Sequence, residues 1–351
     1  MDIDQSGEAQ EDTHCVTTSA TTKGLPPVLY HYTDSGGLQG VVGPGKGPYV
    51  VEFHDKDSKF RYQGDHDLYT NGKAALFRAT DVRYMNDSQE LVFGARIVND
   101  RLTKAAEDTS LGVALQSAFL SVANVFDPDN VFDWPFRCFA VCFCESGDLL
   151  SQWRGYAGGV GGFSIGFPRE VLNEYSFGIH VMAAGNIRDL PSPAQLVRVA
   201  YGEDDARIRA DELVDAIKNE HRHGNLILDR DGIPGFAVAM AAFRAIAGMK
   251  HEAFEEEKEW RLLAVANAHQ QVRTRSRASG VVPYMDVAVN ARLRVGTNDV
   301  AEKPLAKVYV GPAEPVQSKG QVVAVGDLLR SRGMWGFGQV PVERSEAPFR
   351  S

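Results

Sequence analysis

The 351-residue chain lacks the features that mark several large classes of protein. Its four cysteines are too few for a disulfide framework. No stretch approaches the roughly 20 apolar residues of a membrane-spanning helix, and the N-terminal MDIDQSGEAQED has no apolar signal core. Lysine and arginine number 37 against 46 aspartate and glutamate, a net charge of −9 that excludes binding to DNA or anionic lipid through bulk charge. These absences predict a reduced, cytoplasmic, soluble protein that does not bind membranes.

The composition that remains is typical of a globular enzyme or binding protein. Hydrophobic residues make up 44% and charged residues 24%, and the length suffices for a core without disulfide or metal support. Residues 1–27 carry little apolar surface and are predicted to form a disordered acidic tail, which leaves 28–351 as a single large domain. Strand and helix signals are interspersed without a regular βαβ rhythm, so the predicted class is α+β.

Periodicity and β-propensity assign the elements. Predicted strands cover residues 28–33, 74–79, 139–144, 163–167, 196–201, 259–265, 281–289 and 306–311. Predicted helices cover 38–42, two segments within 90–126, then 204–222 and 237–256. The glycines at 158–162 suggest a hairpin turn, and the Gly-, Asp- and Lys-rich segment 43–72 suggests a long irregular connection.

Two short patterns resemble ligand motifs without meeting their requirements. Residues 40–47 approach a phosphate-binding loop, but Gly47 stands where the motif needs Ser or Thr. Cys142 and Cys144 alternate along a strand and are better explained as core residues than as zinc ligands. No metal site is therefore predicted.

Four separated motifs remain that packing alone does not explain. They are Leu29–Thr33 (LYHYT), Arg83–Glu90 (RYMNDSQE), Leu149–Tyr156 (LLSQWRGY) with Gly162–Phe167 behind it, and Phe254–Leu262 (FEEEKEWRL). The chain ends in SEAPFRS. In this order the motifs resemble a bacterial family catalogued only as domain of unknown function 2971, over about residues 28–351.

The His-Tyr-Thr strand and the Glu-x-Glu strand are also remotely similar to the ADP-ribosyltransferase (PARP/DarT-like) superfamily. This resemblance implies a split mixed sheet with flanking helices and NAD as the substrate. The implied activity is that of an NAD-dependent mono-ADP-ribosyltransferase of a toxin or anti-phage defence type. Such a protein cleaves the nicotinamide–ribose bond and transfers ADP-ribose to a macromolecule, either protein or nucleic acid.

The resemblance also implies roles for individual residues. His31, followed by Tyr32 and Thr33, would hold the adenosine-side ribose of NAD. Glu259, together with Glu257, would carry the chemistry. The two strands are expected to lie side by side and flank a cleft.

The segment Thr80–Glu90 is the best positional match to the part of the superfamily that covers the nicotinamide, with Tyr84 or Asn86 facing the ligand. Trp153 and Arg154 are candidates for a stacking and phosphate-binding pair. The same two residues suit a core position and a salt bridge equally well. Asn86 with Asp87 is equally typical of a simple turn.

Alternation along a strand would place Glu257, Glu259 and Arg261 on one face, where the arginine helps to keep the glutamates ionised. The same residues, in EEEKEWRLLAVA, also suit a solvated helix with an i, i+4 pair between Glu257 and Arg261. A lone strand histidine such as His31 is often simply bonded to backbone.

Two classes of function stay open at this point. One is an NAD-consuming enzyme, which is a transferase or, with water as the acceptor, a glycohydrolase. The other is a non-catalytic module of the same fold that binds a nucleotide or a partner.

Overall fold

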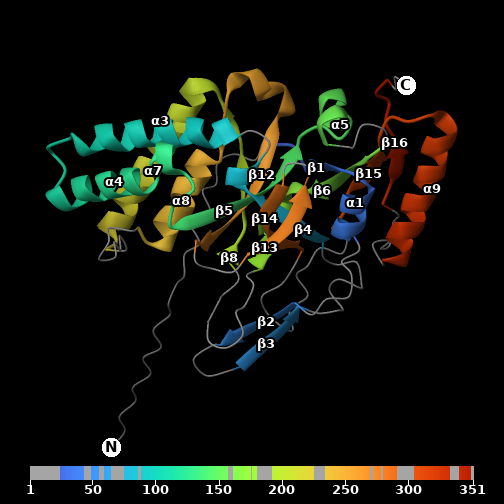
Figure 1. Ribbon diagram of the computed structural model, residues 1–351, viewed down its shortest axis with the longest axis horizontal. Helices are drawn as coiled ribbons and strands as arrows, with labels where there is room; N and C mark the ends of the chain where they lie inside the picture. Colours follow the sequence, from blue (N-terminus) through green and yellow to red (C-terminus); the bar gives the residue numbers. More distant parts are fainter. Residues whose placement is uncertain are drawn as a thin grey trace, which may run out of the picture.

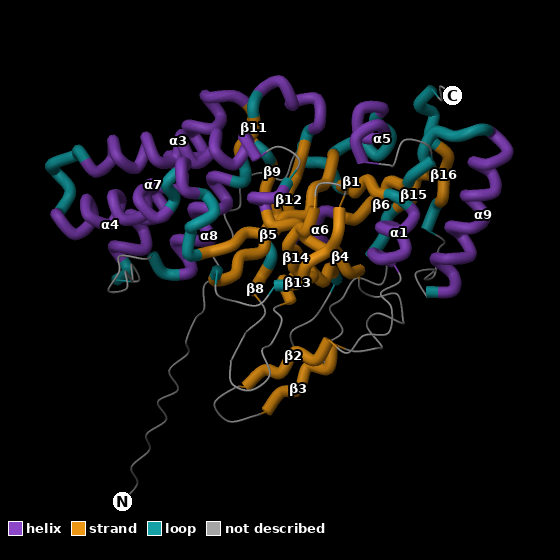
Figure 2. Tube along the Cα trace, in the orientation of Figure 1, coloured by secondary structure: helices purple, strands orange, loops and turns teal. Residues whose placement is uncertain are grey.

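The structure is a computed structural model that describes residues 24–42, 49–54, 59–64, 75–85, 88–156, 161–174, 176–179, 192–224, 234–268, 272–277, 280–290, 304–332 and 340–348. A mixed sheet forms its centre and helices flank the sheet (Figures 1 and 2), so the predicted α+β class is confirmed. Among the described residues, no helix is long and apolar enough to cross a membrane.

Twelve strands of the described chain form the main sheet. Its path runs β16-β15-β6-β1-β5-β4-β14-β7-β8, while β12 pairs with β5, β9 with β12, and β13 with β14. The β15–β16 pair is parallel and the other pairs are antiparallel. The strands are β1 (Val28–Thr33), β4 (Ala75–Asp81), β5 (Phe136–Cys144), β6 (Phe163–Pro168), β7 (Ser176–Ile179), β8 (Ser192–Pro193), β9 (Gln195–Arg198), β12 (Glu259–Asn267), β13 (Arg273–Arg277), β14 (Gly280–Val289), β15 (Lys307–Val310) and β16 (Val342–Arg344).

The sheet divides at β5. One edge of β5 pairs with β12 along its whole length, from Cys144 opposite Glu259 to Phe136 opposite Asn267. The other edge is shared, because β4 pairs with β5 at residues 139 and 140 whereas β1 pairs with it at Cys144. The intervening residues 141–143 have no partner strand on that edge within the described chain. This gap between β1 and β4, here called the fork, opens the sheet at its centre.

Helices cover both faces of the sheet, and each face has its own core. Alternate residues of β5 and β12 point to opposite faces. On the first face, Cys138 and Leu263 belong to a core that includes residues of α3, α4, α7 and α8; on the second, Phe143 and Leu262 belong to a core with α1, α6 and α9. The helices are α1 (Ser35–Val42), α3 (Ser88–Ala106), α4 (Val113–Val125), α5 (Leu150–Tyr156), α6 (Arg169–Glu174), α7 (Gly202–Arg222), α8 (Phe236–Ile246) and α9 (Pro315–Ser331). In Figure 1, α3, α4, α7 and α8 gather at one end and α1 and α9 lie toward the other.

Glycine allows the close approach of α3 and α8. A Cβ atom at Gly94 would lie 2.3 Å from the backbone oxygen of Ile246, the last residue of α8. Only a residue without a side chain fits this contact. The contact fixes the position of Glu90, one turn earlier on α3, beside the chain that follows α8.

Several local predictions are wrong. The helix expected over 237–256 ends at Ile246 and is followed by β11 (Met249–Lys250) and the 3₁₀ helix η3 (Glu252–Glu257). The segment 43–72 is not wholly irregular, because β2 (Tyr49–His54) and β3 (Lys59–Gly64) pair as a separate two-stranded sheet. The turn predicted at 158–162 lies partly outside the described residues, and β5 and β6 do not pair with each other as a hairpin would, since α5 lies between them and β6 pairs with β1 and β15. Two further 3₁₀ helices are η1 (Val82–Tyr84) and η2 (Pro128–Asn130), and β10 (Ala200–Tyr201) pairs with β11.

Most of the predicted tail, residues 1–23, lies outside the described residues. The remaining residues of that segment contact the domain. Leu25 packs against the second-face core, and Arg169 donates hydrogen bonds to the carbonyls of Pro26 and Pro27. The described contacts of the domain therefore begin before residue 28.

Candidate functional site

A cavity of about 1020 Å³ lies at the fork. Residues of both sheet faces line it, because the sheet is interrupted there. The side chains that give it chemical character are His31, Tyr32, Thr33, Arg78, Thr80, Glu90, Cys142, Tyr156, Lys250, Glu257, Glu259, Arg275, Arg277 and Asp286. The structure thus brings five of the predicted site residues, namely His31, Tyr32, Thr33, Glu257 and Glu259, to one cavity.

The strands of His31 and Glu259 do not lie side by side as expected, because β5 separates them. Tyr30 and Glu259 both lie opposite Cys144, which places their Cα atoms about 10 Å apart at ordinary strand spacing. Opposed residues share a face, so Glu259 projects from the first face and His31, next to Tyr30, from the second. The ring of His31 contacts Phe77 and Phe143 of the second-face core, which agrees with this placement.

His31 uses the backbone that the fork leaves unpaired. Its Nδ1 lies 2.9 Å from the carbonyl oxygen of Cys142. Because a carbonyl only accepts, Nδ1 carries the hydrogen, and Nε2 of the neutral ring is left as an acceptor. Burial lowers the pKa of His31, the Cys142 bond partly offsets this, and the charge of Arg275 lowers it further. The imidazole is therefore neutral at neutral pH.

Tyr32 and Trp153 form a structural unit next to the cavity. The Tyr32 hydroxyl donates to the carbonyl of Ser146 and accepts from the N–H of Leu149, which fixes the start of α5. The Trp153 indole is 3% exposed, packs edge-on against Tyr32 and donates to Asp148. Of the two interpretations of Trp153, the buried core position is therefore the one that the structure shows.

Glu259 is held by a buried ion pair. It is 5% exposed and Arg261 is 3% exposed. Arg261 donates from Nε and Nη2 to the two carboxylate oxygens, at 2.8 and 2.9 Å. Burial alone would raise the pKa of Glu259, but the charge and hydrogen bonds of Arg261 outweigh it and lower the pKa to about 2. The alternation predicted for a strand is thus confirmed for these two residues, and the helix alternative is excluded.

Lys250 extends this pair into a network of three carboxylates and two cations. Its Nζ lies 2.8 Å from Glu257, 2.9 Å from Glu90 and 3.2 Å from Glu259. Arg261 also donates to Glu90, at 2.6 Å. Burial would lower the pKa of Lys250, but the charges of Glu259 and Glu90 raise it instead. We call these five residues the carboxylate wall.

Glu257 is the more accessible of the two predicted catalytic glutamates. It closes η3 rather than lying in β12, and its side chain is 20% exposed against 6% for Glu259. Burial raises the pKa of Glu257, and Lys250 partly offsets the effect. The carboxylate of Glu259 already accepts three hydrogen bonds, two from Arg261 and one from Lys250, whereas that of Glu257 accepts one, from Lys250. Glu257 is therefore the carboxylate better able to accept a new hydrogen bond.

Arginines line another part of the cavity. Arg275 and Arg277 of β13 both donate to the hydroxyl of Thr80, at 2.6 and 3.4 Å. The guanidinium of Arg78 lies 5.5 Å from the centre of the Tyr284 ring, and that of Arg275 lies 5.9 Å from it. We call Arg78, Arg275 and Arg277, with Thr80 and Tyr284, the arginine wall.

Other predicted residues lie away from the cavity lining. Tyr84 is 38% exposed and packs edge-on against Phe132. Arg154 is exposed on α5, and Arg261 lies behind Glu259. Asn86 lies outside the described residues.

Sequence reasoning missed several residues that line the cavity. Glu90 stood in a quoted motif without a role, and Lys250 belonged to a predicted helix. Tyr156 ends the LLSQWRGY motif and lines the fork cavity together with Cys142 and Glu257, and burial raises its pKa. The alternating Arg-x-Arg-x-Arg at 273–277 was the one available signal for the arginine wall.

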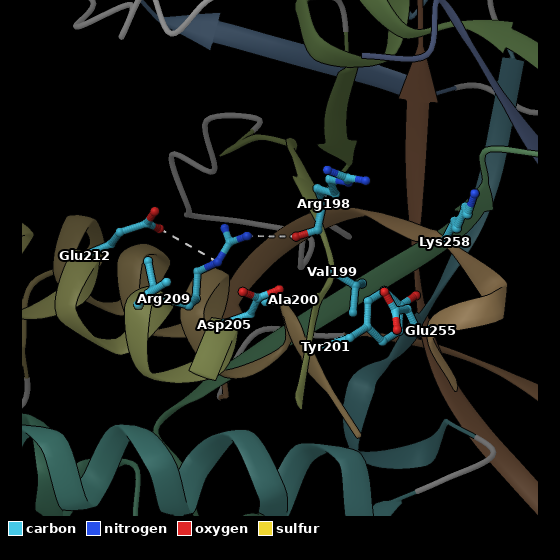
Figure 3. Close-up of a pocket in the computed structure, with 10 residues that line it drawn as sticks. Arg198, Val199, Ala200, Tyr201, Asp205, Arg209, Glu212, Glu255 and Lys258 are labelled. Carbon is cyan, nitrogen blue, oxygen red and sulfur yellow. Dashed lines mark hydrogen bonds and ion pairs between the residues drawn. The ribbon is translucent and has the colours of Figure 1, made fainter. Parts of the chain in front are cut away.

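A smaller pocket of about 290 Å³ lies where α7, η3 and β10 meet. Figure 3 shows its central cation, Arg209, already paired: the guanidinium donates to the carbonyl of Arg198 at 2.9 Å and lies 3.7 Å from Glu212. Tyr201 at its edge accepts from the N–H of Glu259 at 2.7 Å. This pocket therefore adjoins the start of β12, and none of the residues predicted for the site lines it.

The described residues hold no group of three or more His, Cys, Asp or Glu side chains arranged to bind a metal ion. Burial raises the pKa of the Cys142 thiol well above its ordinary value, so this thiol is not a ready ligand.

Comparisons with known proteins give one family match. No curated protein and no solved structure shows significant similarity to the chain. The match spans residues 152–262, a narrower range than the 28–351 expected from the motifs, and it includes most of the LLSQWRGY motif and all of the FEEEKEWRL motif. Over residues 152–262 the chain matches the family described as "Protein of unknown function (DUF2971)", which confirms the resemblance to family 2971 for this segment.

Proposed function

We propose that the fork cavity binds NAD and that the protein cleaves the nicotinamide–ribose bond, as an ADP-ribosyltransferase-like enzyme with a macromolecular acceptor. The observation that carries the proposal is the convergence of His31, Glu257 and Glu259 on one cavity. Its volume of about 1020 Å³ is at the upper end of the range of small-molecule sites, about 300–1000 Å³, and leaves room for a dinucleotide.

The available groups fit the parts of NAD. The neutral His31 ring offers Nε2 as an acceptor for a ribose hydroxyl. Tyr156, 43% exposed at the end of α5, offers an aromatic ring in the lining of the same cavity as Glu257. It takes the nicotinamide-covering role that the sequence suggested for Tyr84 or Asn86.

The reaction requires stabilisation of positive charge rather than an acid. When the bond between C1′ and the nicotinamide nitrogen breaks, its electron pair leaves with neutral nicotinamide and the ribose becomes oxocarbenium-like. A carboxylate on the ribose 2′-hydroxyl stabilises this charge. Glu257 supplies that carboxylate, while Glu259 positions Lys250 and Arg261. The acceptor's nucleophile then bonds to C1′ and loses its proton to solvent.

Nicotinamide release from NAD by the purified full-length chain tests the proposal. We expect Glu257→Gln to lower the rate by about 10² or more, the usual scale for one electrostatic stabiliser. His31→Ala should mainly weaken NAD binding, because its contact is remote from the broken bond. Arg96→Ala, at an exposed position of α3 outside the cavity lining, is the control and should change neither quantity.

Equal turnover by Glu257→Gln and wild type would remove Glu257 from the mechanism. A larger loss in Glu259→Gln than in Glu257→Gln, with folding retained, would return the chemical role to Glu259. Release of free ADP-ribose without any acceptor would identify a glycohydrolase.

The engagement of Glu259 by Arg261 and Lys250 favours a second candidate, a non-catalytic module that binds a nucleotide or a partner. NAD binding without nicotinamide release would support it. No NAD binding at millimolar concentration would reject NAD as the ligand.

A further inference from the structure

The arginine wall carries positive charge that the described protein does not neutralise. Arg273 is paired with the cavity carboxylate Asp286, at 2.8 Å. Arg78, Arg275 and Arg277 have no carboxylate partner among the described residues, and the hydroxyl of Thr80 is the acceptor shared by the last two. The Nε of Arg275 is buried and makes no hydrogen bond to a described group. The hydrogen-bond donors of these guanidinium groups therefore outnumber the described acceptors at this part of the cavity.

The three guanidiniums repel one another. Burial lowers the pKa of Arg275, and the charges of Arg277 and Arg78 lower it further. Arg78 and Arg275 share one aromatic surface, the ring of Tyr284, which is 8% exposed. A cation lying over an aromatic ring gains some compensation, but the ring carries no negative charge.

A simpler explanation is that charged residues protect an edge strand from pairing with another chain. β13 pairs only with β14 among the described strands, so it fits that description. Side chains with that role extend into solvent, however. Arg275, which is half-buried, and Arg277, which is exposed, both cross β14 to donate to Thr80 on β4, the strand beyond it, and both line the cavity. Their direction favours a role inside the cavity.

We propose that Arg78, Arg275, Arg277 and Thr80 form a binding site for a phosphate or diphosphate group of a small-molecule ligand. Guanidinium forks bind phosphate oxygens through paired, charge-assisted hydrogen bonds. The bound anion replaces Thr80 as the shared acceptor and removes the repulsion between the arginines. The inference rests on the proposed function only where it assigns the site to the diphosphate of NAD.

Calorimetric titration of the full-length chain with inorganic pyrophosphate, and separately with inorganic phosphate, tests the site without any nucleotide. We expect the double variant Arg275→Met/Arg277→Met to bind pyrophosphate at least tenfold more weakly than wild type. Arg96→Met removes an exposed charge on α3, outside the cavity lining, and should leave the affinity unchanged. Arg277→Met alone, at an exposed position, should give a smaller loss and serves if the double variant does not fold.

Equal pyrophosphate affinity in wild type and in folded Arg277→Met and Arg275→Met/Arg277→Met would overturn the inference. Tighter binding of a single-stranded oligonucleotide than of pyrophosphate, lost in the same variants, would also overturn it, because the wall would then belong to a nucleic-acid surface.

The ligand assignment is tested by comparing NAD with nicotinamide riboside, which lacks the diphosphate. The double variant should lose at least tenfold in affinity for NAD and should bind nicotinamide riboside as wild type does. Loss of pyrophosphate binding in the variant, combined with no nicotinamide release by wild type, would uphold the phosphate site and reject the proposed activity. An equal loss for both ligands would overturn the diphosphate assignment.

Discussion

The two charged walls of the fork cavity differ in how their charges are balanced. In the carboxylate wall, Glu90, Glu257 and Glu259 surround Lys250 and Arg261, and every charged group has a partner within 3.2 Å. In the arginine wall, Arg78, Arg275 and Arg277 have no described carboxylate partner, and two of them share a neutral hydroxyl. The cavity thus combines a satisfied wall with an unsatisfied one.

The difference separates charges that stabilise the fold from charges that are available to bind a ligand. Removing one member of a buried ion-pair network leaves its partner charge uncompensated, so the members of the carboxylate wall stabilise one another around the start of β12. The charges of the arginine wall are only partly buried and remain available for an external anion. A perturbed pKa alone does not distinguish the two, since both Glu259 and Arg275 have one.

The largest expected contrast is in stability. Arg261→Met leaves Glu259 and Glu90, in a buried site, with only one of their two shared cationic partners, Lys250, and we expect the free energy of unfolding to fall by about 3–5 kcal/mol. Arg275→Met removes repulsion and should change it by less than about 1 kcal/mol. Urea denaturation of both variants measures the contrast. Equal losses would show that the two walls are equally structural.

Acid should weaken the carboxylate wall in a defined range. The pKa of Glu259 is lowered from 4.5 to about 2, so its stabilising contribution is complete above about pH 4.5 and is lost as the pH falls toward 2. Between pH 5 and 2, wild type should lose on the order of 2 kcal/mol that Glu259→Gln does not lose. Unfolding free energies measured across this range for both proteins provide the test, and identical slopes would contradict the assignment.

The smallest expected effect concerns the arginine wall without its ligand. Sulfate, a dianion similar to phosphate, should raise the melting temperature of wild type above its value in sodium chloride of equal ionic strength, because it binds the folded state. The rise in melting temperature should be smaller in Arg275→Met. Expressed as free energy of unfolding, the stabilisation by sulfate should differ between the two proteins by about 1 kcal/mol or less. Since both salts are compared in both proteins, general salt effects cancel. An undiminished increment in the variant would count against the arginine wall as the anion site.

The sequence predicted the parts of the site that depend on local pattern. The β-branched and aromatic run at 28–33 and the alternation of Glu259 and Arg261 are local signals, and both strands form as expected. The fork could not be predicted, because it depends on where β1 and β4 pair along β5, strands that are more than fifty residues from it in sequence.

Tertiary structure also explains the missed residues. Lys250 lay inside an apparently continuous helical pattern, and its role depends on the chain leaving α8 after Ile246, with Gly248 next to the carbonyl of Arg244. The arginines of β13 looked like an ordinary polar strand. Only the positions of β14 and β4 show that two of them converge on Thr80.

The central position of β5 has a consequence for the order of folding. This strand, at residues 136–144, receives partners from both directions along the chain: β1 and β4 precede it, and β12 follows it after more than a hundred residues. During synthesis its second edge stays unpaired until residues 259–267 have emerged. Contacts this distant in sequence slow folding, and an unpaired apolar edge promotes aggregation in the interval. We therefore expect nascent chains that end before residue 259 to depend on chaperones, whereas chains that include β12 can complete the central sheet.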